Sequence, residues 1–421
     1  MRKSKVLIIG GGLYGCLTAL KIKEKYKNQE VEILESGENI LSSFNNIEIN
    51  SIKINNGFHG IEIPRASKLL NFLQSKIQIK FNLKEQKKFI ILNDRILREG
   101  YDINLCNSGQ YSYFNKKKFH SSIYKDFFEI FTNKFKKLLK LCSLRYTNNI
   151  KNVFHLLVPW FMPKQFVYQG IDEGDKFRSK VRSNKVRSFY AFPKKYIFSS
   201  LKPIIKKKLL DKKIVIRTKS KVIFYKKNFY IGSIEKQNLI SNEIIFICSS
   251  PLFILKNSKV LMANLTSNQR FFVNLIIEVF FEVDYFSEIL SLSEYFPELS
   301  RISFLNKSKK STLLHLEIFL DNQKLCNKNF FEQRIKDLLD NIKYQKNIKN
   351  KKFKITGFEI SRKVYFPSLS ALKKVNNYVS KKIQQSKSNK ILGEFSVLPM
   401  NMSKSWIYSE NCLKQFKLNN F

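Results

Sequence analysis

The sequence predicts an α/β fold in which a parallel sheet with flanking helices is joined to a second, α+β domain with a mixed or antiparallel sheet. Residues 6–9 are all apolar, which is typical of a parallel strand that is covered on both faces. A glycine-rich turn and a segment of helical length follow this run directly. The chain has 421 residues, more than one hydrophobic core usually organises, so two domains are expected.

The glycine turn has the spacing GxGxxG, with Gly10, Gly12 and Gly15 in the three key places. In such a turn the first glycine permits the sharp bend, the second lets the backbone approach a pyrophosphate, and the third lets the helix lie close to the strand. The helix begins at Leu13 and Tyr14, whose N–H groups and positive dipole end point at the phosphates. The motif therefore predicts the binding site of a dinucleotide.

An acidic residue stands where the ribose of that dinucleotide is expected. Residues 31–34 form a second apolar strand pattern, and Glu35 follows it, 20 residues after Gly15. A carboxylate at this place accepts hydrogen bonds from ribose hydroxyls and repels a 2′-phosphate, so NADP is disfavoured. A glycine-rich structural turn is the alternative interpretation. The combination of strand, turn, helix, strand and acid favours a Rossmann-like nucleotide-binding domain over that alternative.

The composition excludes several other classes of protein. Hydrophobic residues make up 43% of the chain, so it is not an intrinsically disordered protein. The net charge of +43 comes mostly from lysine, alongside much Asn, Ile and Phe. These are the residues that AT-rich codons favour, so we interpret the charge as a solvated surface and expect no specific nucleic-acid partner.

Cysteine and histidine usage gives no metal site and no disulfide framework. The six cysteines include no CxxC pair, and the four histidines have no metal-site spacing, so no metal is expected and a reducing cytoplasm fits best. The basic N-terminus is not read as a secretory signal because three glycines interrupt its apolar stretch and no cleavage site follows. No segment offers the roughly 20 apolar residues of a membrane helix.

Beyond Glu35 the chain resembles the flavoprotein superfamily of amine oxidases, protoporphyrinogen oxidase and UDP-galactopyranose mutase. Ser42 and Ser43 stand where that superfamily has a Gly-Gly turn against the pyrophosphate and ribityl chain. Gly57 and His59 match the Gly-x-His near the flavin of the mutases, although a packed histidine is an equally good interpretation of His59. The resemblance implies that the cofactor is FAD.

The same resemblance recurs, in order, farther along the chain. Residues 214–218 and Val222 resemble the strand pair in which the backbone of a valine meets the adenine. Residues 391–394 resemble the final strand, whose acid, here Glu394, reaches the ribityl chain. The helix that begins beside the flavin ring is then expected at residues 405–410, with Trp406 in place of a small residue.

The expected FAD-binding domain is discontinuous and consists of residues 1–70, 190–265 and 350–421. The expected substrate domain consists of residues 71–189 and 266–349. Its expected elements are a hairpin around Asn93 and Asp94 and half-buried strands at 271–283 and 313–320.

Arg301, Arg362 and Tyr365 fall where the family places pocket residues. An arginine pair could hold a carboxylate or a diphosphate bidentately. Residues 124–141 predict a basic amphipathic helix packed on the substrate domain. The alternative for this helix is peripheral contact with an anionic membrane.

The resemblance implies an FAD-dependent oxidoreductase that transfers hydride from a small-molecule substrate to the flavin. Two alternatives stay open. One is a flavin-dependent sugar-nucleotide enzyme similar to the mutases, which the Gly57–His59 match favours. The other is a non-catalytic dinucleotide-binding protein, which Ser42, Ser43, Trp406 and Glu410 favour because they replace small residues of the flavin site. No catalytic acid, base or nucleophile is assigned.

Overall fold

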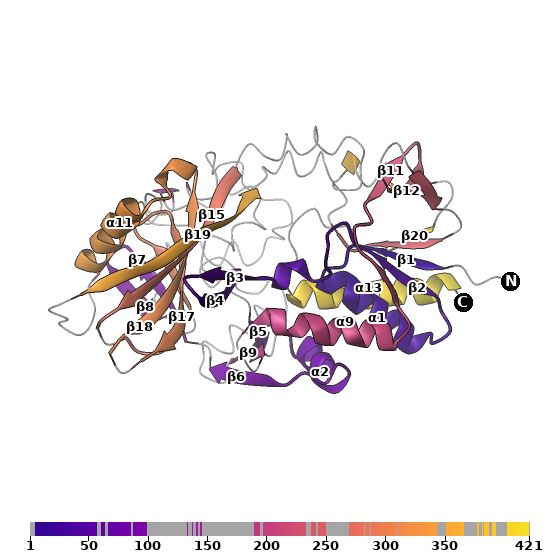
Figure 1. The fold of residues 1–421 in the computed structure, drawn as a ribbon, viewed down its shortest axis with the longest axis horizontal. Helices are drawn as coiled ribbons and strands as arrows, with labels where there is room; N and C mark the ends of the chain where they lie inside the picture. Colours follow the sequence, from indigo (N-terminus) through magenta and orange to yellow (C-terminus); the bar gives the residue numbers. More distant parts are fainter. Residues whose placement is uncertain are drawn as a thin grey trace.

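The structure of the protein is a computed structural model with two lobes (Figure 1). It describes residues 5–56, 60–63, 66–85, 87–98, 133, 137, 140, 141, 144, 189–193, 197–232, 237–240, 243–249, 269–281, 283–286, 288–308, 310–342, 351–365, 377, 378, 381, 383–386, 390–392 and 402–420.

The first lobe is built on a parallel five-stranded sheet with the strand order β10-β2-β1-β14-β20. Its strands are β1 (Val6–Ile9), β2 (Val31–Leu34), β10 (Val215–Arg217), β14 (Ile244–Ile247) and β20 (Lys390–Leu392). The helices of this lobe are α1 (Leu13–Lys25), α2 (Ser67–Ser75), α9 (Leu201–Asp211) and α13 (Met402–Asn420). A three-stranded antiparallel meander completes the lobe with β11 (Val222–Tyr225), β12 (Asn228–Gly232) and β13 (Gln237–Ile240).

Strand β1 shows why the opening of the chain is uniformly apolar. Val6 and Ile8 belong to the core shared with helices α1, α2, α9 and α13, whereas Leu7 and Ile9 belong to the core beneath the meander. Successive side chains of a strand point to opposite faces, so both faces of this strand are covered. The predicted parallel sheet is confirmed, with helices on one face and the meander on the other.

The second lobe is built on a mixed seven-stranded sheet with the order β19-β15-β18-β17-β16-β7-β8. Its strands are β7 (Lys88–Leu92), β8 (Arg95–Arg98), β15 (Gln269–Val279), β16 (Glu288–Leu292), β17 (Leu299–Lys307), β18 (Thr312–Leu320) and β19 (Phe353–Tyr365). All pairs are antiparallel except β16 with β7. Helix α11 (Lys328–Asn341) packs Phe331, Ile335 and Leu338 on one face of this sheet.

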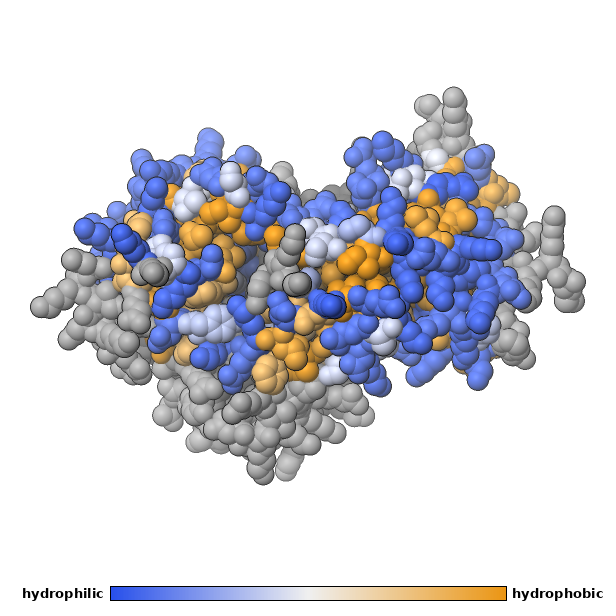
Figure 2. Space-filling model, turned by 60° about the horizontal axis from the view of Figure 1, so that its bottom comes forward, coloured by the Kyte–Doolittle hydropathy of each residue, from blue (hydrophilic) through white to orange (hydrophobic). Residues whose placement is uncertain are grey.

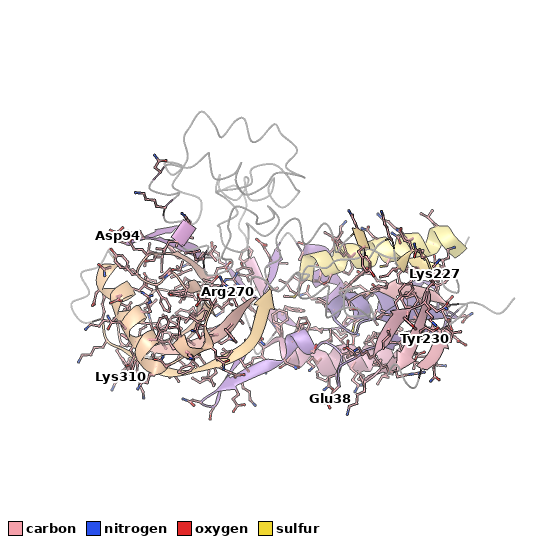
Figure 3. All side chains as sticks on the ribbon, turned by 90° about the horizontal axis from the view of Figure 1, so that it is seen from above. Glu38, Asp94, Lys227, Tyr230, Arg270 and Lys310 are labelled. Carbon is pink, nitrogen blue, oxygen red and sulfur yellow. The ribbon has the colours of Figure 1, made fainter. Side chains whose placement is uncertain are left out.

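Two small β elements lie between the lobes. The hairpin of β3 (Asn46–Ile49) and β4 (Ile52–Asn55) packs against the seven-stranded sheet at Ile276. The second element is an antiparallel sheet formed by β5 (Ile61–Ile63), β9 (Phe189–Pro193) and β6 (Phe81–Glu85). From above, Glu38 and Lys227 mark the first lobe, Lys310 and Asp94 mark the second, and Arg270 lies toward the region between them (Figure 3).

The structure differs from the sequence-based expectation in three places. Strand β19 pairs with β15, so residues 353–365 belong to the seven-stranded sheet and not to the FAD-binding domain assigned to 350–421. Helix α2 crosses the boundary expected at residue 70, since Leu73 packs in the core of the first lobe. Strand β18 is almost wholly buried rather than half-buried. The hairpin around Asn93 is confirmed.

The surface is mostly hydrophilic over the first lobe, at the right of Figure 2, where apolar side chains show only between polar ones. Among the described helices, none combines the length and the apolar character needed to cross a membrane. The helix expected at 124–141 lies almost entirely outside the described residues, so its contact with a membrane stays a hypothesis.

Candidate functional site

The glycine turn between β1 and α1 is held by close backbone packing. Gly10 has a φ of +108°, and a Cβ atom on it would lie 2.9 Å from the Cβ of Ser249. A Cβ atom on Gly15 would lie only 1.9 Å from the carbonyl oxygen of Gly10. The first and third glycines of the motif are therefore required by the packing of the protein itself, as the motif predicted.

Gly12 has a different environment from the other two glycines. Apart from its neighbours in the chain, no atom of the described residues lies within 4 Å of the place where its Cβ would be. Its φ of −69° and ψ of 179° are accessible to any residue. Gly12 is the N-cap of α1, and no side chain caps the helix there. The N–H groups of the first turn, which lack intrahelical acceptors, are thus available to an anion from outside the protein.

The Glu35 carboxylate is oriented toward this turn by two backbone donors. Its Oε2 accepts from the N–H of Gly11 at 2.7 Å, and its Oε1 accepts from the N–H of Gly37 at 2.8 Å. The backbone of Glu35 is also fixed, because its N–H donates to Arg217 and its carbonyl accepts from Ser220. The hydroxyl of Ser36 also donates to Oε1, at 3.3 Å. A carboxylate oxygen can accept two hydrogen bonds, so Oε2 retains capacity for a hydroxyl group.

The segment after Glu35 forms a wall beside the turn. The N–H of Leu41 donates to the carbonyl of Gly11 at 2.8 Å, and Leu41 adopts a left-handed conformation with a φ of 56°. Ser42 and Ser43 follow on an exposed 3-10 turn, η1 (Ser42–Phe44), without a positive φ. Their local conformation therefore does not require glycine, and a contact of Ser43 with a cofactor stays a prediction.

The structure locates the other predicted site residues as follows. Leu13 and Tyr14 form the first turn of α1, and both side chains are buried, so a contact with a phosphate would be made by their backbone N–H groups. Val222 begins β11. The chain just before it is tied to the Glu35 segment, because the N–H of Lys219 donates to the carbonyl of Gly37. His59 and Glu394 lie outside the described residues.

Gly11 also helps to fix the geometry of the glycine turn, although the GxGxxG motif does not single it out. Its N–H orients Glu35 and its carbonyl accepts from Leu41, and a Cβ atom there would lie 2.6 Å from the side chain of Ile40. The only signal in the sequence is that glycine fills a variable place of the motif, between Gly10 and Gly12.

The helix expected at residues 405–410 is present as α13, and its place beside a flavin ring stays a prediction. Helix α13 begins at Met402, and Trp406 packs on Phe72 of α2, with ring centroids 5.3 Å apart. The ammonium group of Lys21 lies 3.2 Å from the centroid of the Trp406 ring and forms an ion pair with Glu410. Lys21 is more than two helical turns beyond Gly12, roughly 13 Å along α1. Trp406 and Glu410 are therefore packing residues and do not crowd the glycine turn.

Arg301 is part of a buried ionic cluster on the second lobe. Its Nε lies 3.1 Å from Oε2 of Glu288, and its NH1 lies 3.7 Å from Oε2 of Glu317. Tyr190 of β9 donates to the other oxygen of Glu288 at 2.6 Å. Because carboxylates already bind the guanidinium, the predicted bidentate grip on an anion is not supported for Arg301. The side chains of Arg362 and Tyr365 lie outside the described residues.

His315 is buried beside this cluster as a neutral imidazole. Burial lowers the pKa of His315 from 6.5 to about 4, with Glu317 opposing the shift and Arg301 adding to it. Its Nε2 lies 2.7 Å from Oδ1 of Asn274. No set of three or more His, Cys, Asp or Glu side chains within the described ranges could hold a metal ion.

The lowered pKa of His315 predicts a loss of stability in acid. Between pH 6.5 and 4 the unfolded chain binds a proton that the folded protein does not, so stability falls as the pH falls through this window. The full effect is about 3 kcal/mol. We expect the free energy of unfolding in urea to fall by about 2 kcal/mol more in the wild type than in His315→Gln between pH 7 and pH 4.5. Equal losses in both proteins would show that His315 does not titrate in this way.

The comparisons with known proteins identify the fold. No family model and no curated protein matches the chain. Among solved structures, cyclohexylamine oxidase from Brevibacterium oxydans IH-35A is 12% identical with a TM-score of 0.61, and 99% of this chain and 100% of that chain are covered. Reduced UDP-galactopyranose mutase is 12% identical with a TM-score of 0.58, with 96% and 91% covered.

A fatty acid isomerase from P. acnes, described as producing CLA, is 8% identical with a TM-score of 0.55, and 99% of each chain is covered. The resemblance predicted from the sequence is thus confirmed at the level of the fold, which extends over both lobes. The names of these three proteins describe an oxidase, a mutase and an isomerase. One fold hosts different reactions here, so the reaction has to be argued from this chain's own residues.

Proposed function

We propose that this protein binds FAD at the glycine turn and acts as an FAD-dependent oxidoreductase of the amine-oxidase-like fold. The observation that carries the proposal is the open space at Gly12, at the positive end of α1, beside a carboxylate that Gly11 and Gly37 already orient. These groups fit the two ends of an ADP moiety, because a diphosphate needs N–H donors and a ribose diol needs an acceptor.

Each residue of the turn has a separate part in the proposed site. Gly12 lets the diphosphate reach the backbone, and the N–H groups of Leu13 and Tyr14 donate to its oxygens. Glu35 accepts from the ribose hydroxyls. By resemblance, Ser43 and His59 face the rest of the cofactor, Val222 its adenine and Glu394 its ribityl chain.

Bound FAD supplies a two-electron acceptor, and the protein's task is to bind it, orient it and keep water from it. In the proposed reaction a small-molecule substrate gives up hydride. The seven-stranded sheet supports a substrate site, because one of its faces is turned toward the hairpin β3–β4 and toward β9, which lie between the lobes. We keep the division into an FAD-binding and a substrate domain as part of the proposal, with residues 353–365 moved to the second.

Of the four residues that favour the non-catalytic alternative, two have partners within the first lobe. Trp406 and Glu410 pack on Lys21, away from the glycine turn. Ser42 and Ser43 need no glycine conformation. The mutase-like alternative rests on Gly57 and His59, which lie outside the described residues, and it shares the same FAD site.

The visible absorbance spectrum of the purified protein tests FAD binding. A flavin spectrum, or its appearance on adding FAD to the stripped protein, is the expected result. A protein that purifies without flavin and does not bind added FAD would contradict both the oxidoreductase and the mutase-like interpretations. Reduction of the bound flavin by a substrate, with no isomerised product, then separates the first from the second.

Substitution of Glu35 tests the proposed ribose contact. In Glu35→Gln the amide can present only one acceptor oxygen to the two N–H donors and the diol, so we expect FAD to bind about tenfold more weakly, which is about 1.4 kcal/mol. The matched control is Glu38→Gln, because Glu38 carries the same charge three residues later with 77% of its side chain exposed. FAD titration by fluorescence measures both, and equal affinities in the two variants would remove Glu35 from the site.

A further inference from the structure

The face of the seven-stranded sheet opposite α11 carries a polar group of residues. We call it the inner face, and its described members from four strands are Asn274, Ile276, Arg301, Ser303, Leu305, Leu313, His315, Glu317 and Ser361. Ile276, Leu305 and Leu313 pack against the hairpin β3–β4, and Tyr190 of β9 reaches Glu288 beside Arg301. The inner face is therefore the one turned toward the glycine-turn lobe (Figure 1).

A directional chain of hydrogen bonds fixes the state of His315. The carbonyl of Phe272 can only accept, so the hydroxyl of Ser361, 3.3 Å away, donates to it. The Ser361 oxygen then accepts from Nδ2 of Asn274 at 3.0 Å, which turns Oδ1 of Asn274 toward Nε2 of His315. An amide oxygen only accepts, so Nε2 carries the proton. The neutral ring is left with Nδ1 as a hydrogen-bond acceptor.

Ser303 stands directly opposite His315 in the register of β17 and β18. Its side chain is buried, with 5% of the residue exposed, and within the described part of the chain its hydroxyl has no hydrogen-bond partner. A buried hydroxyl without a partner costs about 1–3 kcal/mol, and such groups are rare in proteins. Directly opposite residues of an antiparallel pair have Cβ atoms about 5 Å apart, so one small group can contact both side chains.

We propose that His315 and Ser303 form a binding site for a hydroxyl group of the substrate, which donates to Nδ1 of His315 and accepts from the hydroxyl of Ser303. The proposal rests on the proposed function, since it assigns the substrate to the inner face. It adds a chemical class: the substrate carries an uncharged alcohol group at this point.

The pairing of one acceptor with one donor selects this class. A hydroxyl group offers one donor and an acceptor oxygen, and so satisfies both residues. An ammonium group can donate to Nδ1 of His315 and to the oxygen of Ser303, but it has no acceptor for the proton of the Ser303 hydroxyl. A carboxylate has acceptors only, and it would also lie next to Glu317 and Glu288 in a buried site, where like charges repel.

Four small aromatic compounds with different polar groups test the proposal. Benzyl alcohol has the proposed group, benzyl methyl ether lacks the donor, benzylamine is a cation, and benzoate is an anion.

The measurement is the imidazole nitrogen spectrum of the full protein labelled with [¹⁵N]histidine. The chain has four histidines, and His315→Gln assigns the signal of His315. We expect an Nε2-protonated neutral ring at pH 7 whose Nδ1 signal shifts saturably with benzyl alcohol and not with the other three compounds. The proposal is overturned if the Nδ1 signal of His315 shifts with none of the four compounds. It is also overturned if benzylamine or benzoate shifts this signal more than the alcohol does.

Ser303→Ala supplies a second and independent measurement. Removing an unpartnered hydroxyl leaves no donor unsatisfied, so we expect the variant to fold at least as stably as the wild type and to bind benzyl alcohol about tenfold more weakly. The matched control is Ser308→Ala, on the exposed turn that follows β17, which should bind the probe like the wild type. Unchanged affinity in Ser303→Ala overturns the site.

These measurements use no flavin signal, so their failure can be told apart from failure of the proposed function. A protein that binds FAD and ignores benzyl alcohol loses only the hydroxyl site. If the Nδ1 signal of His315 shifts with benzyl alcohol but the protein binds no FAD, the hydroxyl-binding site is retained. The oxidoreductase assignment is then lost, and with it the proposal that the ligand of this site is a substrate.

Discussion

Valine in place of Gly12 is expected to abolish FAD binding without unfolding the protein. In the part of the chain that the structure describes, no atom beyond the chain neighbours lies within 4 Å of the Cβ position. The backbone there, with a φ of −69° and a ψ of 179°, suits a β-branched residue. The side chain would fill the space through which the diphosphate reaches the first turn of α1. We expect FAD affinity to fall by about a hundredfold, equivalent to about 2.7 kcal/mol, while the loss of a glycine N-cap costs about 1 kcal/mol or less of stability. Titration with FAD and urea unfolding measure the two effects.

The separation of the two effects is what makes this variant informative. A valine protein that binds FAD like the wild type would show that the diphosphate does not pass Gly12. A variant that loses FAD only because it unfolds would contradict the open geometry at this position, and the urea midpoint reveals that case.

The first lobe could be predicted in detail because its signals are local. The apolar run of β1, the glycine turn and Glu35 lie within the first 35 residues, and Gly10 and Gly15 are required by the close approach of neighbouring atoms. The hairpin around Asn93 was predictable for the same reason, since Asn tolerates the positive φ that the turn imposes.

Features that depend on contacts between distant segments could not be predicted in this way. Strand β19 follows a polar stretch of the sequence, and its pairing with β15 assigns it to the second sheet. Trp406 and Glu410 depart from the pattern of a flavin-side helix, but both contact Lys21, which donates to the backbone carbonyl of Trp406, 385 residues away in the sequence. A substitution that departs from a family pattern can be explained by a partner that no local pattern reveals.

The polar network of the inner face also depends on contacts between distant segments, so it could not be predicted from the sequence. Asn274, His315 and Ser361 lie on three strands that are far apart in the sequence, and the alternation of β18 predicts only that His315 and Glu317 share a face. Burial on both faces hides even this alternation, because β18 is apolar at most positions. The direction of the hydrogen bonds, which fixes the acceptor on His315, follows only from the three-dimensional arrangement.

Alanine in place of Gly15 is expected to destabilise the folded protein, whereas a change at Gly12 is expected to weaken FAD binding and leave the fold intact. Its Cβ would lie 1.9 Å from the carbonyl oxygen of Gly10 and 3.2 Å from the side chain of Ile8. The oxygen belongs to the backbone of the glycine turn and cannot rotate away, so α1 must move off β1. Because ten residues of α1 are buried, this movement disturbs the core of the first lobe.

We expect Gly15→Ala to lower the free energy of unfolding by about 3 kcal/mol, at the upper end of the usual cost of overpacking, as measured in urea without FAD. Gly12→Ala is the matched control, because it adds the same methyl group three residues earlier, where it meets nothing within 4 Å, and it should cost about 1 kcal/mol at most. Equal stability of the two alanine variants would mean that α1 does not pack on β1 as closely as the structure shows. A large cost confined to Gly15 would confirm that this glycine serves the fold, and that Gly12 alone of the three is kept small for a partner from outside the chain.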